Sequence, residues 1–207
     1  ENGIKLIVDF IDGQKTGFFL DMREMRQLIG NLSKNKKVLN CFSYSGGFSL
    51  YALKHGAVSV QSIEISEQAN KIAEQNFEIN GFKEHKKDIL TMNVFDFIKK
   101  ERLDHDIIIL DPPAFAKKRS DVKNALTKYY ELNRTTLKKM KSGALLLTCS
   151  CSYHVDQDNF ETTIKKAGID ANKELIIISK HRMAMDHSIN IYHKEFDYLK
   201  SFLIYVR

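Results

Sequence analysis

Two cysteines stand one residue apart in Thr-Cys-Ser-Cys-Ser, residues 148–152, of a chain that has 207 residues and three cysteines in all. A structural zinc site would need two further ligands at suitable spacing, so we expect no metal here. A redox pair is more typically Cys-x-x-Cys at the start of a helix. Packing inside a buried strand and a catalytic thiol therefore remain as the two interpretations of Cys149 and Cys151.

A rigid turn carries the next group that could do chemistry. Both prolines of the chain, Pro112 and Pro113, follow Asp111 in Asp-Pro-Pro-Ala-Phe. They fix φ and remove two backbone donors, which makes the segment after the carboxylate stiff. Asp111 and the ring of Phe115 could then hold a planar polar ring, although a turn that merely ends a strand is the alternative.

A third group lies in Asn-Cys-Phe-Ser-Tyr-Ser-Gly-Gly-Phe-Ser, residues 40–49. Its serines and glycines would let a ligand approach the backbone where a helix begins and offers free N–H groups. Glu64 follows at the end of the next predicted strand, where a carboxylate can accept hydrogen bonds from both hydroxyls of a ribose. Together they favour a cofactor that contains a nucleoside over a tight turn and a surface glutamate.

Alternating strand-like and helix-like segments must position these groups. Strands are predicted at 37–43, 58–66, 105–111, 143–150, 174–180 and 198–206, and helices at 47–57, 66–82, 120–140 and 155–168. The Ile- and Leu-rich runs at 105–111, 143–150 and 174–180 suit strands buried on both faces, and 198–206 suits an edge or closing strand. This order predicts an open, doubly wound α/β sheet, in which ligands bind beyond the carboxyl ends of the strands.

Charge and composition limit the partners. The formal net charge of +6 and the pI of about 9.1 favour an anionic partner such as nucleic acid, although a solvated basic surface gives the same values. The basic clusters at 34–37 and 117–119 could contact phosphate, and the second adjoins the predicted site. No apolar run approaches the ~20 residues that span a bilayer, and three cysteines suit a reducing cytoplasm.

Taken together, these motifs resemble a known family. The chain resembles class I S-adenosylmethionine (SAM)-dependent methyltransferases, and more narrowly the bacterial 23S rRNA cytosine-5 methyltransferase group, at 12–24, 38–52, 111–117 and 146–152. The resemblance implies an α/β fold in which residues 27–207 form a Rossmann-like, seven-stranded sheet with helices on both faces. Residues 1–26 would form a small β-hairpin segment, turning at Asp12-Gly13, left from a central domain. Members usually begin with a PUA domain, which is absent here, so we expect a part of a longer protein.

The resemblance also implies contacts to SAM. Its methionine end would lie by Lys15, Thr16, Phe42, Tyr44, Ser45, Gly46 and Gly47, its ribose by Glu64, and its adenine by Ile65, Asn93 and Val94, with Asp111 between the cofactor and the target base. Two positions depart from the family pattern. Asn93 stands where relatives often have an acidic residue, and Asp186-His187-Ser188 stands where they tend to read Asp-His-Pro.

The reaction implied by the resemblance is methylation of C5 of a cytosine in RNA. C5 is a poor nucleophile, so a thiolate must first add at C6, and Cys151 is the implied nucleophile. Asp111 is the implied group near N3, where negative charge develops. The base would be splayed out of its stack to contact Pro112, Pro113, Phe115 and Lys117. Cys149 would then be a packing residue or an accessory thiol.

Three other functions stay open. Enzymes that methylate an exocyclic amine often use an Asn-Pro-Pro-aromatic turn, and related ring-nitrogen methyltransferases use an Asp-Pro-Pro turn without the cysteine. A non-catalytic RNA-binding module could also keep this fold. We expect RNA, and 23S rRNA in particular, as the partner, with no membrane and no metal, and the sequence allows a homodimer.

Overall fold

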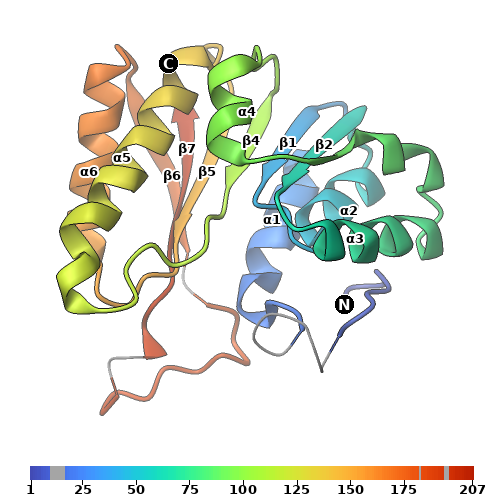
Figure 1. The fold of residues 1–207 in the computed structure, drawn as a ribbon, viewed down its shortest axis with the longest axis horizontal. Coiled ribbons are helices and arrows are strands. Elements are labelled where there is room, and N and C mark those ends of the chain that lie inside the picture. The colour runs from blue at the N-terminus through green and yellow to red at the C-terminus, as the bar shows by residue number, and fades with distance from the viewer. Residues whose placement is uncertain (10–16, 182, 194–195) are drawn as a thin grey trace. The chain divides into compact units, whose positions relative to one another are not determined.

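The computed structural model describes residues 1–9, 17–181, 183–193 and 196–207. The chain forms two compact units. The first comprises Glu1–Val94 and Met183–Ser188, and the second comprises Phe95–Arg182 and Ile189–Arg207. Strands and helices alternate along both units (Figure 1).

The first unit is built on three parallel strands in the order β3-β2-β1. Its elements are η1 (Leu20–Met22), α1 (Arg23–Leu32), β1 (Lys37–Cys41), α2 (Gly47–Lys54), β2 (Ser59–Glu64), α3 (Glu67–Ile79), η2 (Lys83–Asp88) and β3 (Ile89–Thr91). Helix α1 is amphipathic, and its fully buried Met25 and Ile29 form part of the core. Helix α3 begins at the N-cap Ser66, as predicted, where the hydroxyl accepts a hydrogen bond from the Ala69 N–H at 3.2 Å.

The second unit is built on four strands in the order β4-β5-β7-β6. Helix α4 (Val94–Lys100) leads into it, followed by β4 (Ile107–Leu110), η3 (Arg119–Asp121), α5 (Val122–Lys139), β5 (Leu145–Ser150), α6 (Gln157–Asp170), β6 (Leu175–His181) and β7 (Lys200–Val206). Strands β4 and β5 are parallel, and β7 is antiparallel to both β5 and β6. Helices α5 and α6 lie side by side (Figure 1).

An aromatic row fixes the packing of this unit. The ring of Tyr129 on α5 lies 5.2 Å from the ring of Phe160 on α6, which lies 5.4 Å from the ring of Phe202 on β7. All three side chains are fully buried. Large aromatic rings bury much apolar area, so this row holds α5 and α6 against the strands and places Tyr129 next to the end of β5.

The predicted roles of the last two strands were wrong. The run 198–206 was expected as an edge or closing strand, but β7 lies between β5 and β6, and β6 is the edge. The run 174–180 was expected to be buried on both faces, yet Ile176 and Ile178 are 38% and 53% exposed. Exposure alternates along β6, as expected for a strand with one covered face, and a bulge between Ile177 and Ser179 shifts its register.

The N-terminal segment also differs from expectation. The turn predicted at Asp12-Gly13 lies outside the described residues. Residues 1–9 and 17–19 contain no strand, and helical structure begins at Leu20, inside the segment 1–26 that was expected to be a hairpin. Asp9 and Gly17 lie side by side, because a Cβ built on Gly17 would clash with the Asp9 carbonyl oxygen. The hairpin itself stays a prediction.

The predicted fold class is confirmed. The described residues contain seven strands in a mixed arrangement, interleaved with helices, as in a Rossmann-like α/β fold. The pairings β1–β2, β2–β3 and β4–β5 are parallel, and the two pairings of β7 are antiparallel. None of the helices in the described ranges is long and apolar enough to cross a membrane.

Candidate active site

Cys151 and Cys149 lie in different environments. Cys149 is inside β5, opposite Ser201 of β7, and has no exposed surface. Cys151 is the first residue after β5 and is half-buried. Its Sγ donates a hydrogen bond to the carbonyl oxygen of Pro112 at 3.5 Å. Of the two thiols, only that of Cys151 can meet a substrate without opening the strand.

Tyr129 holds the residues on both sides of Cys151. The Ser150 hydroxyl donates to the Tyr129 hydroxyl at 3.0 Å, and the hydroxyls of Tyr129 and Ser152 lie 3.0 Å apart. Ser152 Oγ also accepts a hydrogen bond from the backbone N–H of Ala116 at 3.1 Å. Burial raises the pKa of Tyr129 to about 12, so the phenol keeps its proton. This buried network fixes the Cys151 loop against the Asp-Pro-Pro-Ala-Phe turn.

That turn follows β4 as predicted. Because β4 and β5 are parallel neighbours, with Leu110 paired to Thr148, Asp111 and Cys151 follow adjacent strand ends. Asp111 is half-buried and Pro112 is buried, whereas Pro113 and Lys117 are exposed. The structure thus places the predicted nucleophile and the predicted carboxylate at the carboxyl ends of two neighbouring strands of the second unit.

Phe115 is less open to a ligand than its position in the sequence indicated. Its ring lies 4.8 Å from the ring of Tyr129 and 6.2 Å from that of Phe95, and Lys128 Nζ lies 5.6 Å from its centroid. The residue is half-buried. Part of its surface is therefore already used for packing, and only the rest could stack on a base.

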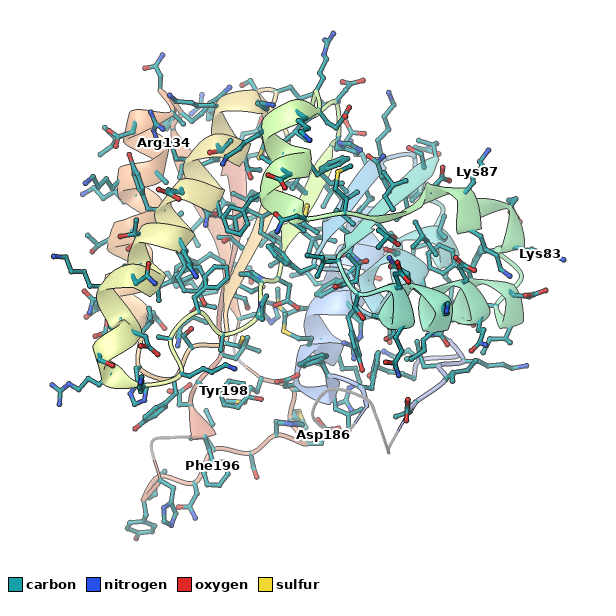
Figure 2. The ribbon with its side chains drawn as sticks, in the orientation of Figure 1. Lys83, Lys87, Arg134, Asp186, Phe196 and Tyr198 are labelled. Carbon is teal, nitrogen blue, oxygen red and sulfur yellow. The ribbon has the colours of Figure 1, made fainter. Side chains whose placement is uncertain are left out.

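Lys200 was missed by the sequence reasoning. It is the first residue of β7, is only 6% exposed, and donates hydrogen bonds of 2.7 Å to the carbonyl oxygens of Ser152 and of Tyr198, which Figure 2 labels. Burial lowers the pKa of Lys200 to about 8, and the charge of Cys151 opposes that shift. The only signal in the sequence was a lysine inside the apolar run 198–206.

In the first unit, the loop from β1 to α2 is strained. Phe42 and Tyr44 have φ of 60° and 47°, and Gly46 has φ of 80°. Left-handed conformations cost non-glycine residues about 1–3 kcal/mol each and cluster at binding sites. A Cβ on Gly46 would lie 2.9 Å from Phe77 Cε1, and one on Gly47 would lie 3.1 Å from Arg26 Cδ. Gly46 therefore has packing and backbone reasons to be glycine, whereas a side chain at Gly47 would require Arg26 to shift by a few tenths of an ångström.

Glu64 ends β2 beside this loop. Its Oε2 accepts a hydrogen bond from the Tyr44 N–H at 3.0 Å, and its Oε1 accepts from the N–H groups of Ile65 and Ser66 at 2.8 and 3.0 Å. A carboxylate has about four acceptor positions. The two hydroxyls of a ribose would therefore share the carboxylate with these donors or replace one of them.

The predicted adenine contacts lie close to Glu64. The N–H of Met92 donates to the carbonyl oxygen of Glu64 at 3.0 Å, so Asn93, the next residue, is held near the end of β2. Asn93 is exposed, and Ile65 is 64% exposed. Val94 is buried and offers almost no surface. An exposed apolar side chain next to a carboxylate fits the adenine and ribose of an adenosine.

The remaining predicted residues are Lys15 and Thr16, the two basic clusters and the segment around Asp186. Lys15 and Thr16 lie outside the described residues, and the basic clusters at 34–37 and 117–119 are exposed. Asp186, labelled in Figure 2, accepts a hydrogen bond from Arg23 Nη1 at 2.5 Å, so the segment that departs from the family pattern is attached to α1. Ala184 adds a backbone bond to Asp21 there.

Comparisons with known proteins agree with these features. The chain is 40% identical over 206 residues to ribosomal RNA large subunit methyltransferase I of Pseudoalteromonas translucida, and 41% identical over 207 residues to the protein of that name from Vibrio parahaemolyticus. Each match covers 98% of this chain and 52% of the relative, so the chain spans about half the length of the curated relatives it matches.

Solved structures and a family model complete the comparison. The crystal structure of SMU.776 complexed with SAH superposes with a TM-score of 0.86 at 30% identity, over 99% of this chain and 54% of that one. Residues 1–171 match the model of the S-adenosylmethionine-dependent methyltransferases. These matches confirm the predicted class and SAM as the cofactor: the chain belongs to the S-adenosylmethionine-dependent methyltransferase family.

Proposed function

We propose that the protein methylates C5 of a cytosine in 23S rRNA and that Cys151 is the nucleophile. The observation that carries this proposal is the half-buried thiol of Cys151 at the end of β5, with its Sγ 3.5 Å from the Pro112 carbonyl of the Asp-Pro-Pro turn. Methylation of a ring or exocyclic nitrogen needs no thiol at that place. The names of the curated relatives support rRNA as the substrate class.

The residues of the first unit would hold SAM. Glu64 would accept hydrogen bonds from the ribose, the exposed Ile65 and Asn93 would flank the adenine, and the strained loop through Phe42, Tyr44 and Gly46 would bind the methionine end. Lys15 and Thr16 belong to this proposal by resemblance alone. When bound, SAM supplies a methyl group on a positively charged sulfur.

The residues of the second unit would activate the base. The Cys151 thiolate adds to C6 of the cytosine, so that an S–C6 bond forms and electron density moves to C5 and N3. Asp111, in its protonated form, is proposed to donate a hydrogen bond to N3, where the negative charge develops, while Pro113, Phe115 and Lys117 contact the ring and its phosphate. C5 then forms a bond to the methyl carbon as the methyl–sulfur bond breaks, which would leave a neutral thioether. A base removes the C5 proton, the S–C6 bond breaks and the thiolate is restored.

A product assay tests this proposal. The protein is incubated with labelled SAM and unmodified 23S rRNA fragments, and the nucleosides are then separated. We expect labelled 5-methylcytidine, and we expect it to be lost in Cys151→Ala. A labelled N-methylated base would replace the cytosine-5 proposal with methylation of a nitrogen. Absence of both label transfer and SAM binding would favour the non-catalytic RNA-binding module.

A further inference from the structure

A buried cation lies beside the cysteine loop without having been assigned a role. Lys200 is 6% exposed, and its two hydrogen bonds go to the backbone carbonyls of Ser152 and Tyr198. Removing an ammonium group from water is costly unless the charge is compensated. Two carbonyl oxygens satisfy two of its three protons but carry no net charge. The charges of Cys151, Asp197 and Asp156 offset part of this cost.

The geometry ties this charge to Cys151. Lys200 pairs with Ser150 across the antiparallel β5–β7 ladder, and its Nζ binds the carbonyl oxygen of Ser152 at 2.7 Å. The ammonium thus contacts the backbone segment that carries the thiol. The same segment is also held by Tyr129, through Ser150 and Ser152.

Three titratable groups interact with the Lys200 charge: Cys151 of the cysteine loop, Asp197 before β7 and Asp156 at the start of α6. The Asp156 side chain accepts a hydrogen bond from the Asn159 N–H at 2.7 Å as the N-cap of α6. Around Cys151, the hydroxyl of Tyr129 also feels the charge of the thiol, but it stays neutral. Lys200 is therefore a cation whose charge acts on Cys151.

We propose that Lys200 is a positioning residue that holds the Ser152 carbonyl and stabilises the thiolate of Cys151 with its charge. The thiolate is the nucleophilic form of cysteine, and a nearby cation favours it. Because burial lowers the pKa of Lys200 to about 8, the ammonium persists at neutral pH and is lost as the pH rises further. This inference rests on Cys151 as the proposed nucleophile, but it concerns the state of the thiol and not the identity of the base.

Thiol alkylation tests the inference without RNA. The full chain is treated with iodoacetamide between pH 6 and 10, and modification of the Cys151 peptide is followed by mass spectrometry. Lys200→Gln keeps an N–H donor for the carbonyls but removes the charge, whereas Lys200→Arg keeps both. We expect alkylation at pH 7 to fall about tenfold in Lys200→Gln, which corresponds to about one pKa unit, and about twofold or less in Lys200→Arg.

Two controls separate charge from structural damage. Lys180→Met removes an exposed lysine of the adjacent strand β6 that pairs with Glu161, and it should leave the Cys151 profile unchanged. In concentrated urea all variants should react alike, because the fold that joins Lys200 to Cys151 is gone. If Lys200→Gln is not folded, Lys200→Arg carries the test: its alkylation should equal that of the wild type at pH 7 and exceed it above pH 8, where Lys200 loses its proton and arginine does not.

The alkylation and nucleoside assays together separate the inference about Lys200 from the cytosine-5 proposal. A wild-type alkylation profile in Lys200→Gln, or an equal loss in Lys200→Gln and Lys200→Arg, overturns the inference and leaves the cytosine-5 proposal standing. A charge-dependent profile combined with an N-methylated product in the nucleoside assay keeps the inference about the thiolate and removes the cytosine-5 proposal.

Discussion

The Sγ of Cys151 lies 3.5 Å from the carbonyl oxygen of Pro112 and donates a hydrogen bond to it. This contact joins two segments that are 39 positions apart in the sequence, the end of β5 and the turn after β4. Ser152 and Ala116 add a second bond between the same segments at 3.1 Å. The two motifs that the sequence singled out for chemistry therefore form one rigid group.

The hydroxyl of Tyr129 should be important for that rigidity. In Tyr129→Phe, the buried hydroxyls of Ser150 and Ser152 each lose a hydrogen-bond partner. We expect the free energy of unfolding to fall by about 1–3 kcal/mol. Tyr130→Phe is the matched control, because the Tyr130 hydroxyl donates a hydrogen bond to Asp170 at the surface. Its loss should lower the free energy of unfolding by less than about 1 kcal/mol. Urea unfolding of both variants measures the difference, and equal effects would contradict the role of the network.

Lys200 should make stability depend on pH in a defined window. Its pKa is about 8 in the folded chain and ordinarily 10.5, so the unfolded chain binds more protons between these two values. The free energy of unfolding of the wild type should therefore rise, relative to Lys200→Gln, as the pH increases from about 8 to 10.5. Urea unfolding at pH 7, 8, 9 and 10 measures the difference in the free energy of unfolding between the wild type and Lys200→Gln. A difference that does not change with pH would show that burial does not penalise the Lys200 charge.

Glu64 should contribute to SAM affinity. Glu64→Gln removes the charge that would bind the ribose hydroxyls, and we expect the Kd for SAM to rise about 10- to 100-fold, as for loss of hydrogen bonds to a charged group. Glu67→Gln in the first turn of α3 is the control, because it removes the same charge from an exposed side chain that is not among the predicted SAM contacts. Calorimetric titration with SAM gives both values. Unchanged affinity in Glu64→Gln would exclude the ribose contact.

Gly46 should tolerate no side chain. Gly46→Ala combines a φ of 80° with a Cβ that lies 2.9 Å from the Phe77 ring, and we expect a loss of about 2–4 kcal/mol in the free energy of unfolding. Gly81→Ala has a similar φ of 83° but nothing within 4 Å of the added Cβ, so it isolates the backbone cost of about 1–2 kcal/mol. Thermal unfolding compares the two, and equal losses would mean that the contact with α3 is not tight.

Some features followed directly from the sequence. The strand-like runs and the small residues between them correctly predicted strands that end at Cys41, Glu64 and Leu110, or within two residues of them. Since parallel strands carry their functional residues at one end, Asp111 and Cys151 could be placed at neighbouring ends without a structure. The N-cap at Ser66 was also readable from local chemistry.

Other features depend on contacts between distant residues. Lys200 reaches Ser152 across 48 positions, and Tyr129 reaches it across 23, so no local spacing reveals either. The place of β7 between β5 and β6 is a choice of strand order, which a run of Ile and Leu does not encode. Helix α1 (Arg23–Leu32) was missed because a hairpin was expected up to residue 26.

The central claim is that Cys151 forms a covalent bond to C6 of the target cytosine. RNA that contains 5-fluorocytidine tests it. With fluorine at C5 there is no C5 proton for a base to remove, so the S–C6 bond cannot be eliminated and should persist. With SAM present, we predict a denaturant-stable protein–RNA adduct in the wild type and in Cys149→Ala, and none in Cys151→Ala. An adduct that persists in Cys151→Ala but is lost in Cys149→Ala would exchange the two roles. Methyl transfer to unmodified RNA by a wild-type protein that forms no adduct would contradict the claim.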